Sequence, residues 1–120
     1  MQIIALNGVT ATTTGTGRSV ENLTKLSVQV SATAISAGNG AFTIEGSNDG
    51  TNWDTLMFIR TVANTNAQQI TRDVSVTLSS NTNEMLLLDD FIGCKMLRVS
   101  VTVTTDGTYT AIINGQKIAV

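Results

Sequence analysis

Apolar and polar residues alternate with a period of two along most of this chain. From residue 26 to residue 34 every second residue is apolar, and Ser, Gln or Thr fills each position between them. The same alternation recurs over residues 42–45, 74–78 and 97–104. One apolar face and one hydroxyl-rich face are typical of half-buried antiparallel strands. The pattern predicts strands over residues 2–6, 9–14, 24–35, 41–47, 53–60, 70–78, 84–88, 96–105, 108–113 and 116–120.

Turn-forming dipeptides punctuate these segments. Asn or Asp followed by Gly accepts the positive φ of a tight turn, and between alternating segments it indicates a hairpin. Such pairs stand at Asn7-Gly8, Asn39-Gly40, Asp49-Gly50, Asp106-Gly107 and Asn114-Gly115. The clearest hairpin spans Thr105–Thr108. Many short strands in 120 residues, without an internal repeat, predict an all-β protein: a single antiparallel β-sandwich of jelly-roll type, with residues 1–120 as one domain.

The segment from Glu84 to Ile92 breaks the alternation with a run of apolar residues. Three interpretations fit this run: a strand buried on both faces and followed by a turn, a short helix, or a surface covered by another subunit. The buried strand is the simplest of the three. Because Met85–Leu88, Phe91 and Ile92 are more apolar than an exposed strand edge normally is, we also expect a homo-oligomer, either a dimer or a trimer.

The composition excludes several classes of function. The chain has no histidine and a single cysteine, Cys94, which excludes His-dependent catalytic triads, His-ligated zinc, intrachain disulfides and multi-cysteine metal sites. A net charge of −2 offers no electrostatic footprint for nucleic acid, and the aromatic residues, 4% of the chain, are too few for a base-stacking platform. We therefore expect no enzymatic activity, no cofactor, no bound metal and no nucleic-acid partner.

The beginning of the sequence shows no export signal. It lacks a basic start, and its apolar run is only four residues long, whereas a secretory signal needs about 7–15 apolar residues. No stretch approaches the roughly 20 apolar residues of a membrane-spanning helix. We expect a protein that is made and kept in a cytoplasm and has no membrane partner.

Two acidic segments are candidate calcium ligands. Asp89 and Asp90 are adjacent, and neighbours on a strand point to opposite faces, so a turn is the simpler interpretation and a calcium site the alternative. Residues 45–50 resemble the start of a calcium loop. The twelfth position of that loop needs a bidentate Glu but falls on Leu56, which excludes an EF-hand.

Three further features have a structural and a functional interpretation. Gly15–Ser19 lacks the spacing of a phosphate-binding loop, so we expect a flexible turn. Cys94 precedes Lys95, a cation that could lower the thiol pKa, but without a histidine partner a buried structural cysteine is the default. Trp53, the only tryptophan, is predicted to close the end of the core; stacking on a sugar ring is the alternative.

Two segments resemble known families. Residues 42–53, reading FTIEGSNDGTNW, resemble a hairpin of galactose-binding-like jelly rolls, such as discoidin and related carbohydrate-binding modules, and of small tailed-phage virion proteins. Residues 95–101, KMLRVSV, resemble a late strand of both groups, with Met96 where an aromatic residue is usual. Residues 105–111, TDGTYTA, are similar to the phage group.

The resemblance implies a function in binding. The chain lacks the additional loop aromatics and arginines that grip glycans, so the phage group fits better. It implies a structural virion protein of a tailed phage, made in the host cytoplasm, and most plausibly a head decoration or cement protein. Its partners would be the major capsid protein, copies of itself, or both. The alternative is a glycan- or receptor-binding module of a phage tail or fibre.

Overall fold

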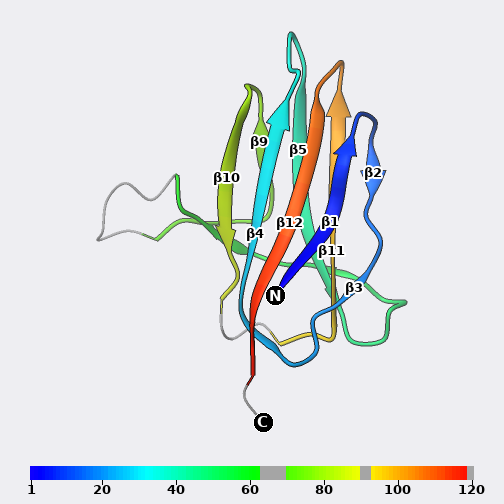
Figure 1. Ribbon diagram of the computed structural model, residues 1–120, viewed down its shortest axis with the longest axis vertical. Helices are drawn as coiled ribbons and strands as arrows, with labels where there is room; N and C mark the ends of the chain where they lie inside the picture. Colours follow the sequence, from blue (N-terminus) through cyan, green and yellow to red (C-terminus); the bar gives the residue numbers. More distant parts are fainter. Residues whose placement is uncertain (63–69, 90–92, 119–120) are drawn as a thin grey trace.

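Two antiparallel sheets pack face to face in the computed structural model, which describes residues 1–62, 70–89 and 93–118 (Figure 1). The first sheet has the strand order β1-β12-β4-β10-β7-β8. The second has the order β2-β11-β5-β6, with β3 pairing β11 and β9 pairing β5. This confirms the predicted all-β sandwich, and the strand order is compatible with the predicted jelly roll. Within the described ranges no helix is long and apolar enough to cross a membrane.

The strands follow the alternating segments of the sequence. In the described residues, the two sheets contain eight strands of three to eleven residues and four strands of two residues. They are β1 (Gln2–Val9), β2 (Thr13–Thr14), β3 (Arg18–Ser19), β4 (Leu23–Thr33), β5 (Asn39–Ser47), β6 (Asp54–Thr55), β7 (Phe58–Arg60), β8 (Arg72–Asp73), β9 (Val76–Leu78), β10 (Thr82–Leu87), β11 (Met96–Thr104) and β12 (Thr108–Lys117).

The core lies between the sheets and takes the inward half of each alternation. Its largest fully buried side chains include Tyr109, Phe42 and Phe58. The Tyr109 and Phe42 rings meet edge to face, with centroids 5.9 Å apart and an interplanar angle of 72°. Each fully buried large apolar side chain contributes roughly 1.5–3 kcal/mol, so the period of two stabilises both sheets at once.

Two segments predicted as single strands each cross from one sheet to the other. The predicted strand 53–60 is divided into β6, which pairs with β5, and β7, which pairs with β10. The predicted strand 70–78 is divided in the same way into β8, which pairs with β7, and β9, which pairs with β5. Both predictions are wrong in this respect, because a segment that changes sheets does not keep one face toward the core.

Only two of the five Asn/Asp-Gly pairs form connecting turns. Asp49-Gly50 and Asp106-Gly107 do so, with positive φ at both glycines. The other three pairs lie within strands, where Gly8 accompanies a register shift of β1 and Gly115 one of β12. Residues 108–113 and 116–117 therefore belong to one strand, not to two as predicted.

Gly40 lies in β5 for a steric reason. A Cβ at this position would overlap the ring of Tyr109 from the opposite sheet. The Tyr109 hydroxyl donates a hydrogen bond of 2.8 Å to the backbone oxygen of Asp106. The ring is thus held between the hairpin and the glycine, which brings β12 and β5 close together.

The apolar run that begins at Glu84 forms β10, which is half-buried. Glu84, Leu86 and Leu88 point inward, whereas Met85 and Leu87 point outward and are each 38% exposed. In residues 84–89 neither the strand buried on both faces nor the short helix is found, because the outward positions of an ordinary alternating strand are themselves apolar. Phe91 and Ile92 lie outside the described residues.

Candidate functional site

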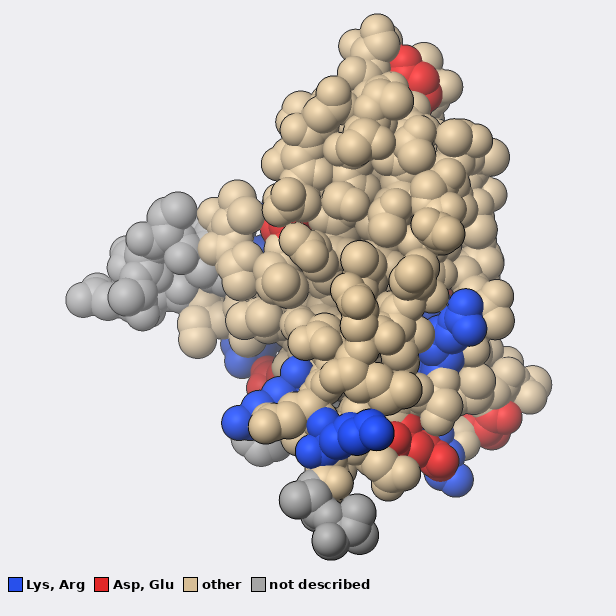
Figure 2. Space-filling model, viewed as in Figure 1, with Lys and Arg blue, Asp and Glu red and all other residues tan. Residues whose placement is uncertain are grey.

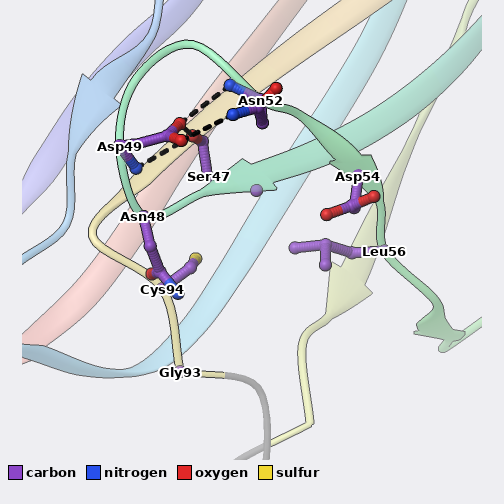
Figure 3. Close-up of a pocket in the computed structure, with 9 residues that line it drawn as sticks. Ser47, Asn48, Asp49, Asn52, Asp54, Leu56, Gly93 and Cys94 are labelled. Atoms are coloured by element: carbon purple, nitrogen blue, oxygen red, sulfur yellow. Dashed lines mark hydrogen bonds between the residues drawn. The ribbon is translucent and has the colours of Figure 1, made fainter.

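The turn after β5 is organised around the Asp49 carboxylate (Figure 3). This group accepts hydrogen bonds from the Thr51 and Asn52 backbone nitrogens, both at 2.8 Å, from Asn52 Nδ2 at 2.7 Å and from Ser47 Oγ at 3.0 Å. The bonds from the backbone of Asn52 and then of Thr51 hold the pKa of Asp49 well below its ordinary value. The carboxylate is therefore ionised and used to fix the turn.

A small pocket of about 310 Å³ lies beside this turn. Figure 3 shows Asp54 and Leu56 on one side and Gly93 and Cys94 on another. Asn48 closes the pocket near Cys94, since its Oδ1 accepts a hydrogen bond of 3.1 Å from the Lys95 backbone nitrogen. The carboxylates of Asp49 and Asp54 and the thiol of Cys94 line this pocket. The Asp49 carboxylate is already hydrogen-bonded within the turn.

The Cys94 thiol is half-buried and packs against the core, in line with the structural interpretation. Burial raises its pKa, so the thiol is protonated at neutral pH. The Lys95 ammonium, which could have lowered the pKa, lies 3.9 Å from a Glu21 carboxylate oxygen. The pocket thus contains a neutral thiol and no activated nucleophile at this position.

Only one of the two adjacent aspartates, Asp89, lies within the described residues. Asp89 accepts hydrogen bonds from Arg72 at 3.0 and 3.2 Å, which gives its carboxylate a partner of opposite charge. Asp90 lies outside the described residues. In the part of the chain that the structure describes, no three or more Asp, Glu, Cys or His side chains are placed to hold a metal ion.

Trp53 does not close the core, and the prediction that it does is wrong. The side chain is half-buried and lies outside the core cluster. The guanidinium of Arg98 lies over the indole ring, 4.3 Å from its centroid, and is hydrogen-bonded to both Glu45 carboxylate oxygens at 3.1 and 3.3 Å. Trp53, Arg98 and Glu45 form a group on the outer face of the second sheet.

This group explains the glycine-rich segment before β3. A Cβ at Gly17 would lie 2.8 Å from Trp53 Cη2, so only glycine lets the backbone approach the indole ring this closely. Arg18 and Ser19 then pair with Leu97 and Met96 of β11. The expected flexible turn at residues 15–19 is therefore wrong in part, since its second half is paired in the sheet. Sequence reasoning missed the group, although Glu45 and Arg98 both stand at outward positions of their strands.

The outer face of the first sheet is a second candidate surface. Exposed lysines stand only near the start of β4 (Lys25) and at the end of β12 (Lys117). We define the uncharged face as the outward residues of the four longest strands of this sheet, away from these two lysines. They are Gln2 and Ile4 of β1, Thr108, Thr110, Ile112 and Asn114 of β12, Ser27, Gln29, Ser31 and Thr33 of β4, and Asn83, Met85 and Leu87 of β10.

Figure 2 shows this side of the molecule, on which most of the Lys, Arg, Asp and Glu side chains gather toward the lower end and an acidic group lies at the upper tip. A row of three apolar residues, interrupted by Gln29, crosses the uncharged face and is called the apolar row below. The strand registers place Ile4 beside Ile112, Ile112 beside Gln29, and Gln29 beside Met85. Ile4 is 50% exposed and Met85 38% exposed, so the row is open to solvent. No stretch of sequence predicts this row, because each of the four strands contributes a single residue to it.

The comparison with solved structures found one match that supports a shared fold. No model of a protein family matches the sequence, and no curated protein is significantly similar to it in sequence. The crystal structure of PirA aligns with a TM-score of 0.48 and 10% identity over 97% of this chain and 92% of that chain. The crystal structure of the SPBc2 prophage-derived protein YomS aligns with a TM-score of 0.68 and 18% identity over 94% of this chain and 90% of that chain. The chain thus shares its two-sheet fold with a prophage-derived protein.

Proposed function

We propose that this chain is a structural protein of a tailed-phage virion that decorates the head and stabilises the shell by binding to it. The prophage origin of YomS, whose fold the chain shares, supports a phage role. The resemblance of residues 42–53 to a hairpin of small virion proteins supports the same role. The mechanism is association without chemistry: each copy that binds only the assembled shell lowers the free energy of that shell relative to its separated subunits.

The uncharged surface is the observation that carries this proposal. Soluble globular domains have about 25% charged residues over the whole chain. Here the charged residues are 13% of the chain, and the uncharged face, which spans four strands, has none. Such a surface suits a protein that is surrounded by neighbours for most of its life.

The test is made on virions of the phage that encodes the chain. We expect the chain to be present in many copies on gradient-purified heads and to stay bound in both 0.1 and about 1 M NaCl, because uncharged contacts are not screened by salt. Heads that lack the chain should release DNA at a lower temperature, and added native chain should restore the release temperature while heat-unfolded chain should not. Absence from the particle, or loss in moderate salt, would contradict the proposal.

A glycan-binding module of a tail or fibre is the second candidate. The surface position of Trp53 favours it, since an aromatic ring outside the core can stack on a sugar. Against it, the Arg98 guanidinium already occupies one face of that ring. We expect a glycan array to give no signal above background with the native chain. A specific signal that is lost in Trp53→Ala would favour the second candidate over the first.

A further inference from the structure

We infer that the uncharged face binds the same face of a second copy of this chain, forming a dimer with two-fold symmetry. The inference is independent of the proposed function, since such a dimer forms in solution with or without a virion. It specifies which surface of the chain makes a contact between copies.

The apolar side chains on the uncharged face set it apart from the outer face of the other sheet. Ile4, Ile112 and Met85 lie in one row across the sheet, with Gln29 between the last two. In the adjacent row, Leu87 lies beside Ile59 of β7. In the other sheet the outward positions of the upper halves of β5 and β11 hold Thr, Ser, Asn or Ala. Burial of the apolar row would remove exposed hydrocarbon from water, the main driving force of association.

The lack of charge favours a second copy over a partner of different sequence. Across a two-fold axis a surface meets a copy of itself, so a surface whose charges are all of one sign repels itself. The uncharged face has no such repulsion, and its Thr, Ser, Asn and Gln side chains can each donate and accept hydrogen bonds. A charged partner would find no complementary charge on it.

The size of the face is sufficient for a dimer. The shortest dimension of the molecule, 23 Å, is the viewing direction of Figure 1, so the face lies on its broadest side. The thirteen outward residues of the face each cover about 4.8 Å by 6.6 Å of sheet, roughly 400 Å² in all before side-chain relief is counted. Two copies with that relief bury on the order of 1,000 Å², about the least that a specific interface needs.

The test is sedimentation velocity of the untagged chain at 5–100 µM, with three variants. We expect the native chain to sediment at twice its 12.6 kDa mass. Ile112→Lys, at the centre of the row, should weaken the dimer by about 100-fold or more, because it places two ammonium groups at the two-fold contact. The matched control is Thr102→Lys, an exposed position on β11 of the other sheet, which should leave the dimer unchanged.

Folding is checked separately by circular dichroism. If Ile112→Lys fails to fold, the more exposed Met85→Lys makes the same test at the end of the row. A native chain that is monomeric at 100 µM, or a dimer that persists in the folded face variants, would overturn the inference. A monomer that still binds virions would overturn it and leave the proposed function standing, whereas a dimer absent from virions would do the reverse.

Discussion

Trp53 shows at the scale of a single residue how a core-like pattern can belong to a surface. Its ring is stabilised by the Arg98 guanidinium, which the Glu45 carboxylate holds in place. We expect Trp53→Ala to lower the free energy of unfolding by about 1–2 kcal/mol, the scale of a partly desolvated cation–π contact. Phe42→Ala, in the core, should cost about 3–5 kcal/mol. Urea denaturation of both variants measures this, and equal losses would show that Trp53 behaves as a core residue.

Glu84 is a buried carboxylate that depends on one partner. It is 4% exposed and binds Arg60 Nε at 2.7 Å and Arg60 Nη2 at 2.9 Å. Glu84→Gln should reduce the free energy of unfolding by about 2 kcal/mol, because it removes the negative charge to which the Arg60 guanidinium donates its hydrogen bonds. The control is Glu21→Gln, whose Lys95 partner is 3.9 Å away and largely exposed, and which should change stability by less than about 0.5 kcal/mol. Similar urea midpoints for the two variants would contradict this expectation.

Asp106 makes the stability of the hairpin end depend on pH. Its carboxylate accepts hydrogen bonds from the Ser36, Ala37 and Gly38 backbone nitrogens, led by that of Ser36, and these lower its pKa from the ordinary value of 3.8. A lowered folded-state pKa means that the contribution is complete above about pH 4 and is lost as the pH falls through the folded-state pKa.

The matching variant is Asp106→Asn. The difference in Tm between the native chain and this variant should be largest at pH 7 and should shrink below about pH 4, where the native carboxyl takes up its proton. Thermal unfolding between pH 2 and pH 7 measures both curves. A constant difference over the whole range would mean that the charge of Asp106 does not act through these bonds.

At the scale of elements, alternation predicted the strands that keep one face toward the core. The long strands β4, β5 and β11 lie within a few residues of their predicted ranges. Segments 53–60 and 70–78 were predicted less well, because each changes sheets and so reverses the direction of its core-facing residues. Local sequence describes the period of a strand and does not specify which sheet it joins.

The candidate surfaces were harder to predict for a related reason. Glu45 and Arg98 become neighbours only through the register of β5 and β11, which are about 50 residues apart in the chain. The apolar residues of β10 were recognised in the sequence as a possible contact surface, but the other apolar residues of the row, Ile4 and Ile112, come from opposite ends of the chain. A surface assembled from single residues of distant strands leaves no local signal.

Close packing between the two sheets gives a prediction for Gly40. Gly40→Ala should destabilise the chain by about 1–3 kcal/mol, since the new methyl group would displace the Tyr109 ring or separate the sheets. Gly93→Ala is the control, because a Cβ there meets nothing within 4 Å among the described atoms. Chemical denaturation compares the two. An unchanged midpoint for Gly40→Ala would show that the gap between β5 and β12 is wider than described.

At the scale of the whole molecule, most charged side chains lie away from the uncharged face. The charged side chains toward the lower end in Figure 2 favour contact with water, whereas the uncharged face is suited to being covered. Ion pairs outside the uncharged face hold strands and loops of the chain itself together, as Arg98 does with Glu45 and Arg72 with Asp89. Association through the uncharged face would therefore leave these pairs intact.

The pairing of β1 with β12 determines when the fold can be completed during synthesis. β1 is made first, yet its partner Ile112 follows Ile4 by more than 100 residues of chain. At about 5–20 residues per second, the edge of β1 waits roughly 5–20 s for β12 to be made. During this time β4 also lacks one of its two neighbours, because β12 lies between β1 and β4 in the sheet. The strand β1 is thus among the last to pair with its neighbour, β12. Contacts between strands so distant in the sequence make folding slow.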